Sequence, residues 1–88
     1  IGGSVGRQMD TEDYHRTRDA LEHSRTGHVT RWHNQRTNRY YAYTPRRTYY
    51  DDEIPCREFV METYYRGRIE EVIGTACRQP DGSWRMLK

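Results

Sequence analysis

The chain has 88 residues and a formal net charge of only +2 at neutral pH, which does not indicate a nucleic-acid-binding protein. Its hydrophobic content is low, but eight Tyr and two Trp supply large side chains to bury, so the composition is not that of a disordered chain. A chain of this length forms one domain with a small core, which is marginally stable unless a constraint such as a disulfide is added.

Residues 1–9 are expected to form a flexible tail, because residues 1–6 are small, apolar and glycine-spaced. Gly2 and Gly6 form a Gly-x-x-x-Gly pattern, which lets helices approach closely within an apolar membrane span. The apolar span itself is absent from this sequence. A single domain is expected over residues 10–88.

A helix is predicted from Asp10 or Thr11 to about His23. Acidic residues follow the predicted start, and Gly27 lies just past the end, as is typical of helix termini. The apolar stripe of this helix is thin, so the helix must dock on a sheet to be stable.

Three side chains on the predicted helix, His15, Asp19 and His23, have the spacing at which one helix face can bind a metal. The alternative is that these residues share an exposed face by coincidence. We favour the second interpretation and expect no metal and no cofactor.

Two strands are predicted after the helix, over residues 29–33 and 39–44, and a polar turn joins them. Pro45 indicates a sheet edge or a strand end, because proline cannot donate a hydrogen bond to a neighbouring strand. A short strand is expected to resume at residues 48–50, before an acidic loop at residues 51–53.

The stretch from residue 56 to residue 84 predicts two β-hairpins. The first has Arg66 and Gly67 as its two-residue loop, because glycine adopts the positive φ that such turns need. Counting back from this loop places Cys56 opposite Cys77, at a non-hydrogen-bonded position where Cα atoms lie about 4.5 Å apart. We therefore predict a Cys56–Cys77 disulfide; the alternative is a pair of buried free thiols.

The second hairpin turns at residues 79–83, where Pro, Asp and Gly suit a three-residue loop. This loop places Trp84 and Met86 on the face that carries Phe59 and Met61. A two-residue Asp-Gly loop would turn Trp84 to the opposite face. The three-residue loop gives a coherent apolar face, so we predict that register.

The opposite face of the first hairpin places Glu62 directly across from Glu71. Two facing carboxylates can share a proton, bind a cation or act as the catalytic pair of a glycosidase. The alternative, which we favour, is a solvated face on which the two side chains turn toward nearby arginines. The sequence also has no phosphate-binding loop and no nucleophile motif, so we predict no catalytic residues and no enzymatic activity.

The segment RYYAYTPRRTYY, residues 39–50, interleaves aromatic residues with arginines. Its candidate binding surface consists of Tyr40, Tyr41, Tyr43, Arg46 and Arg47, because such side chains can stack on bases or sugars and contact phosphates. The alternative is that alternate tyrosines pack in the core while arginines cover the rim. We favour the alternative and keep the five residues as the candidate surface.

Several stretches of this sequence resemble the rickettsial 17 kDa surface antigen family. They are GRQMD at residues 6–10, Trp32 with Asn34, TP-x-RTY at 44–49, CREF at 56–59 and GTACRQPDGSW at 74–84. The resemblance covers nearly the whole chain, and the last stretch is the most specific. Residues 35–43 depart from the family pattern, because they are richer in Tyr and Arg and poorer in Gly.

Members of this family are bacterial outer-membrane lipoproteins in which a glycine zipper precedes a small soluble domain. The resemblance implies that residues 1–6 are the end of the zipper, and that a signal peptide and a lipidated cysteine lie further upstream. It also implies that Cys56 and Cys77 belong to the soluble domain. It brings no catalytic residues.

We therefore predict an α+β fold, in which one N-terminal helix packs on a four- to five-stranded antiparallel sheet with a cross-strand disulfide. The predicted function is that of a non-enzymatic, outer-membrane lipoprotein domain that faces the periplasm or the cell surface. It would have a structural or envelope-integrity role, with cell-envelope components or envelope proteins as partners. The alternative is a module that binds an anionic envelope glycan or lipid, or inhibits a host hydrolase, through the Arg/Tyr-rich surface.

Overall fold

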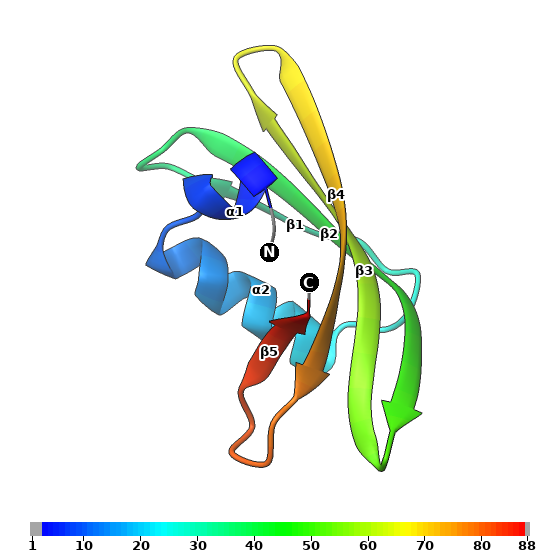
Figure 1. Ribbon diagram of the computed structural model, residues 1–88. Helices are drawn as coiled ribbons and strands as arrows, with labels where there is room; N and C mark the ends of the chain where they lie inside the picture. Colours follow the sequence, from blue (N-terminus) through cyan, green and yellow to red (C-terminus); the bar gives the residue numbers. More distant parts are fainter. Residues whose placement is uncertain (1–2, 88) are drawn as a thin grey trace.

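The structure, a computed structural model, describes residues 3–87 and has two layers (Figure 1). Two helices lie on one side of a five-stranded antiparallel sheet whose strands follow each other in sequence order. The elements are α1 (Gly3–Gln8), α2 (Thr11–His23), β1 (Thr30–Asn34), β2 (Arg39–Asp51), β3 (Ile54–Tyr65), β4 (Arg68–Arg78) and β5 (Trp84–Leu87). The predicted α+β fold is confirmed, with five strands.

Helix α2 begins and ends where the sequence predicted. Asp10 is its N-cap, and the carboxylate of Asp10 accepts a hydrogen bond from the backbone N–H of Asp13 at 3.1 Å. The carboxylate of Asp13 accepts one in return from the backbone N–H of Asp10 at 3.0 Å. This capping box satisfies two of the N–H groups that the start of a helix leaves without partners.

The N-terminal segment docks on the domain, so the expectation of a flexible tail over residues 1–9 is wrong for the residues that the structure describes. Residues 3–8 form α1, and the side chains of Val5 and Met9 are buried in the core. The hydroxyl of Tyr14 donates a hydrogen bond to the carbonyl of Gly6 at 3.0 Å. Burial of two apolar side chains offsets the cost of ordering a short segment. Residues 1 and 2 lie outside the described range, and a glycine zipper stays a prediction.

Strand β2 is continuous, whereas the sequence predicted two short strands separated at Pro45. A bulge between Pro45 and Arg47 shifts the register, and Arg46 is its extra residue. The carbonyl of Pro45 accepts a hydrogen bond from the N–H of Gly27 at 2.8 Å, so the backbone of Pro45 points away from β3. The missing N–H of proline therefore removes no bond from the β2–β3 ladder. The predicted sheet edge is confirmed, because β1 does not pair with β2 at this point.

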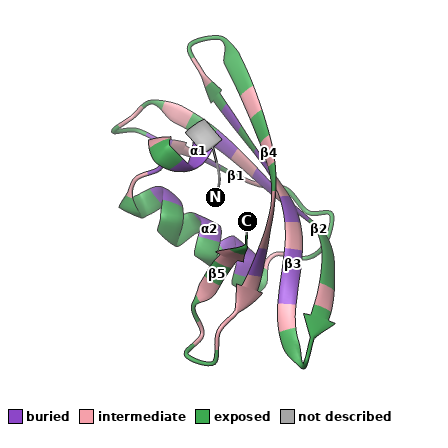
Figure 2. Ribbon diagram, viewed as in Figure 1, coloured by how far each residue is buried: buried purple, intermediate pink, exposed green. Residues whose placement is uncertain are grey.

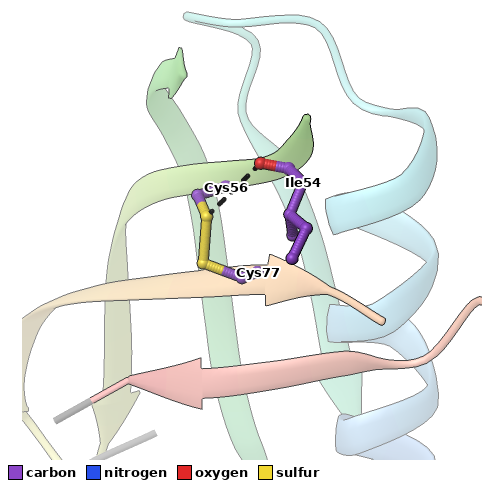
Figure 3. Close-up of a disulfide and its surroundings, with 3 residues drawn as sticks. All are labelled: Ile54, Cys56 and Cys77. Carbon is purple, nitrogen blue, oxygen red and sulfur yellow. Dashed lines mark hydrogen bonds between the residues drawn. A yellow bond between two sulfur atoms is a disulfide. The ribbon is translucent and has the colours of Figure 1, made fainter. Parts of the chain in front are cut away.

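Both C-terminal hairpins have the predicted register. Arg66 and Gly67 have φ angles of 51° and 77°, which suit the two central positions of a tight hairpin turn. Cys56 pairs with Cys77, and the two form the predicted disulfide with their Cα atoms 4.0 Å apart (Figure 3). The disulfide closes the β3–β4 hairpin at the end opposite its loop.

The core lies between the helices and the sheet (Figure 2). Its buried apolar residues are Val5, Met9, Ala20, Leu21, Trp32, Tyr41, Tyr43, Phe59, Met61 and Ala76, with Val72, Trp84 and Met86 packed against them. The three-residue loop of the second hairpin therefore turns Trp84 and Met86 toward the core, as predicted.

Two buried polar contacts join α2 to the sheet. The carboxylate of Asp13, which is fully buried, accepts hydrogen bonds from Nε1 of Trp32 at 2.9 Å and from Nδ2 of Asn34 at 3.1 Å. At the other end of the helix, the guanidinium of Arg57 donates to the carbonyl of Leu21 at 2.7 Å. These contacts satisfy polar groups that burial would otherwise leave without partners. They join residues far apart in the chain, so no local sequence pattern predicts them.

Candidate functional site

The side of the sheet opposite the helices has no covering layer within residues 3–87 (Figure 1). We call this side the open face. Large apolar residues exposed on it include Tyr40 (47%), Tyr64 (47%), Ile69 (69%), Ile73 (57%) and Leu87 (46%). Exposed apolar patches of this kind mark interaction sites.

The predicted binding surface is divided between the two sides of the sheet. Tyr41 and Tyr43 are 2% and 0% exposed and lie in the core, as the favoured alternative predicted, so they do not belong to a binding surface. Adjacent residues of a strand point to opposite faces, which leaves Tyr40 on the open face. Arg46 and Arg47 are exposed at the bulge of β2. A ligand for Tyr40, Arg46 and Arg47 stays a prediction.

The two buried tyrosines have altered acidity. Burial raises the pKa of Tyr41 and of Tyr43 from 10.0 to about 12, because desolvation disfavours the charged phenolate. The nearby carboxylate of Asp13 adds to the rise in the pKa of Tyr41, whereas the guanidinium of Arg57 opposes the rise in that of Tyr43. Both side chains therefore act as neutral parts of the core.

Three rings and an isoleucine form a continuous row across the open face, which we call the aromatic row. His33, Tyr40, Tyr64 and Ile69 are successive cross-strand neighbours on β1 to β4. The ring of His33 stacks on that of Tyr40 with centroids 4.1 Å apart, and Tyr40 meets Tyr64 edge-on at 6.0 Å. Nε2 of His33 lies 2.8 Å from Oδ1 of Asn38 and shares a hydrogen bond with it. These contacts hold the rings in place.

A hollow with a volume of about 460 Å³ lies beside the aromatic row. Ala42 is one of its lining residues, and its methyl group is smaller than the side chains beside it on the neighbouring strands. Arg31 and Glu62 are the cross-strand neighbours of Ala42 and line opposite sides of the hollow. A hollow of this size with few polar groups is typical of a small-ligand site.

Tyr40 was predicted from the sequence as a binding residue, whereas Ala42 and Arg31, which also line this hollow, were not. The available signal was one small residue, Ala42, among large aromatic ones at alternate positions of the strand. That signal becomes specific only when the register shows what stands beside the alanine on the adjacent strands.

The predicted facing pair of carboxylates is confirmed, because Glu62 pairs directly with Glu71. Both residues are exposed on the open face. Within residues 3–87, neither carboxylate lies within 4.0 Å of a basic group, so the expected turn toward nearby arginines is not observed. Solvation of the open face limits the repulsion between the two charges.

The helices provide neither a metal site nor a membrane span within the described part of the chain. His15, Asp19 and His23 are exposed on α2, and no group of three or more His, Cys, Asp or Glu residues among residues 3–87 is placed to hold a metal. Neither described helix is both long enough and apolar enough to cross a bilayer.

The chain is similar to surface antigens of several Rickettsia species. It is 32% identical to the 17 kDa surface antigen of Rickettsia bellii (strain RML369-C) over 94% of its own length. It is 35% identical to that of Rickettsia conorii and 33% identical to that of Rickettsia prowazekii (strain Madrid E), each over 77% of its length. These alignments cover 55%, 43% and 43% of the relatives, so the chain spans about half the length of the curated relatives that it matches.

No solved structure matches the chain. Residues 19–85 match the family described as 17 kDa outer membrane surface antigen, a region that includes the end of α2, the first four strands and the disulfide. The match covers most of the chain and confirms the resemblance seen in the sequence. The chain therefore belongs to the 17 kDa outer membrane surface antigen family.

Proposed function

We propose that this chain is a non-enzymatic domain of the bacterial cell envelope that contacts other envelope components through its open face. The family description supports a place at the outer membrane. The Cys56–Cys77 disulfide agrees with an oxidising compartment outside the cytosol. The observation that carries the contact role is the open face, where several large apolar side chains are exposed on one side of the sheet.

The proposal includes a lipid anchor and a glycine zipper upstream of this domain in the full-length protein. The relatives are about twice as long as the aligned region, which leaves room for such segments. Cell fractionation of the full-length protein tests the location. We expect the protein in the outer-membrane fraction, and release from it when the predicted lipidated cysteine is replaced. Recovery of the unaltered protein in the cytosol would contradict the proposal.

The contact role is tested by placing a photo-activated crosslinking residue at single positions in living cells. Ile69 and Ile73 are exposed on the open face, whereas Arg18 is exposed on α2 and serves as the matched control. We expect crosslinks to envelope proteins or lipids from the first two positions and none from Arg18. Equal crosslinking from all three positions, or none from any, would rule out the open face as the contact.

A second candidate is a module that binds an anionic glycan or lipid, or that inhibits a host hydrolase. The observation that favours it is the guanidinium of Arg47, which lies 4.7 Å from the centre of the Tyr49 ring beside the exposed Arg46. Such a pair can contact a phosphate or carboxylate and cover a sugar ring. Titration of the labelled chain with anionic cell-wall fragments should shift the signals of these residues. Shifts confined to other parts of the chain would reject this candidate and leave the first intact.

A further inference from the structure

We propose that the hollow over Ala42 binds a short zwitterionic peptide, with the carboxylate of the peptide at Arg31 and its ammonium group at Glu62. This inference rests on the proposed function, because it assigns a ligand class to the open face. Three observations carry it: the size of the hollow, the placement of opposite charges on its two sides, and the apolar wall beside it.

The dimensions of the hollow match about three residues of extended peptide. Arg31 and Glu62 lie on β1 and β3, with Ala42 between them on β2, so they are two strand spacings apart. Two spacings are about 10 Å, and an extended chain covers about 3.5 Å per residue. A volume of about 460 Å³ also accommodates a tripeptide with a medium-sized central side chain.

The charges at the two sides are opposite and are not used within the protein. Among residues 3–87, neither Arg31 nor Glu62 lies within 4.0 Å of an oppositely charged group. Elsewhere on the open face the opposite holds, since Arg47 and Glu58 are 3.9 Å apart and form an ion pair. A ligand can therefore engage Arg31 and Glu62 without first breaking an ion pair.

This charge pattern selects among ligand classes. A ligand with only negative charge would be repelled by Glu62 and by Glu71 beside it, and a ligand with only positive charge would leave the guanidinium of Arg31 without a partner. A zwitterion is attracted at both ends. Its carboxylate can accept two parallel hydrogen bonds from the guanidinium of Arg31, while its ammonium donates to the carboxylate of Glu62.

The apolar wall suits the body of such a peptide. Tyr40, Tyr64 and Ile69 line the hollow in the cross-strand row next to Arg31, Ala42 and Glu62, and can pack against an apolar central side chain. The ring of Tyr40 is already stacked on His33, which is itself held by Asn38. Rings that are in place before binding lose little side-chain entropy when a ligand arrives.

The experiment is an NMR titration of the full chain, isotope-labelled, with the tripeptide Ala-Leu-Ala and three blocked forms of it. The blocked forms carry an N-terminal acetyl group, a C-terminal amide, or both. We expect the free peptide to shift the signals of Ala42, Tyr64 and Ile69. Each single block should weaken binding by about fivefold, because it removes one partly exposed charge pair. Equal binding of the doubly blocked peptide, or no shift with the free peptide, would overturn the proposal.

Two variants assign the ends of the peptide. In Arg31→Gln the free and amidated peptides should bind equally, and in Glu62→Gln the free and acetylated peptides should bind equally. Arg85→Gln and Glu53→Gln, which remove exposed charges outside the hollow, should leave all four affinities unchanged. Ala42→Leu should abolish binding while retaining the amide spectrum of the folded chain.

The outcomes separate this inference from the proposed function. If the peptides do not bind but Ile69 and Ile73 still crosslink to envelope components in cells, the ligand class is wrong and the contact face stands. If an uncharged sugar shifts the same signals and the peptides do not, the charged ends have no role and the inference fails. If neither crosslinks nor peptide binding are found, both the inferred ligand class and the proposed function are wrong.

Discussion

Phe59 lies directly across from Gly74 on neighbouring strands, and its ring fills the space above the glycine. A Cβ atom at position 74 would lie 2.8 Å from Cζ of Phe59, which is closer than atoms in contact can approach. The ring is fully buried and has little room to move away. We predict that Gly74→Ala lowers the free energy of unfolding by about 1–3 kcal/mol through overpacking, measured by urea denaturation.

A double-mutant cycle tests the cause of this effect. In a Phe59→Leu background the smaller side chain leaves space, so Gly74→Ala should cost much less than in the natural chain. Thr75→Ala on the same strand serves as the control, because Thr75 faces the other side of the sheet. An equal cost of Gly74→Ala in both backgrounds would show that the ring is not responsible.

The disulfide between Cys56 and Cys77 should be a main contributor to stability. The two cysteines are 21 residues apart, and closing a loop of this length stabilises a domain by about 3 kcal/mol in the chain-entropy description. We predict that reductant lowers the urea midpoint of the natural chain. The Cys56→Ala, Cys77→Ala double variant should have this lowered urea midpoint without reductant, and reductant should not change it. A response in the double variant would mean that reductant acts elsewhere.

Arg57 should be more important for stability than exposed arginines. Its guanidinium donates hydrogen bonds to the carbonyl of Leu21 at 2.7 Å and to Oγ1 of Thr48 at 3.0 Å, and the residue is only 7% exposed. It satisfies a carbonyl that the end of α2 leaves unpaired. Arg57→Met should lower the free energy of unfolding by about 2–4 kcal/mol, because the carbonyl loses a charged partner. Arg85→Met, at an exposed position, should change it by less than about 0.5 kcal/mol.

Asp10 should contribute to the loss of folding stability at acid pH. The amide of Asn34, then the backbone N–H of Asp13, and then the charge of Arg36 lower the pKa of Asp10 from 3.8 to about 2. Since the pKa in the folded state lies below that in the unfolded state, the ionised carboxylate stabilises the fold above pH 3.8, and this contribution is lost as the pH falls toward 2.

The urea midpoint measured through this pH range is the test. In Asp10→Asn the stability should fall less steeply as the pH decreases. Asp52→Asn, in the exposed β2–β3 loop, should show the same fall as the natural chain. A profile for Asp10→Asn as steep as that of the natural chain would assign the acid sensitivity to other groups.

Tyr41 and Tyr43 should make the stability of the fold fall at alkaline pH. Burial raises the pKa of each hydroxyl from 10.0 to about 12, so the folded state keeps both neutral where the unfolded chain ionises. Their contribution is fully present below pH 10 and is lost as the pH rises toward 12. Tyr43→Phe should reduce this loss, measured by urea denaturation against pH. Tyr50→Phe, at a residue that is 70% exposed, should not.

Local chemistry in the sequence was sufficient to predict the helix and the C-terminal hairpins. Asp10 marked the start of α2, and the Arg66-Gly67 turn set the register of β3 and β4, because each signal acts within a few residues of the chain. The opposed cysteines then followed from that register, since pairing in a hairpin is counted from its loop.

The functional surface depended on the tertiary structure. Alternation places Tyr40 on one face and Tyr41 and Tyr43 on the other, but only the position of the helices decides which face is buried. The docking of α1, the burial of Asp13 and the hollow over Ala42 likewise arise between residues far apart in the chain. The sequence alone therefore determined α2, the register of the two C-terminal hairpins and the disulfide of this protein. The tertiary structure decided which side of the sheet is open, because burial depends on what packs against each face.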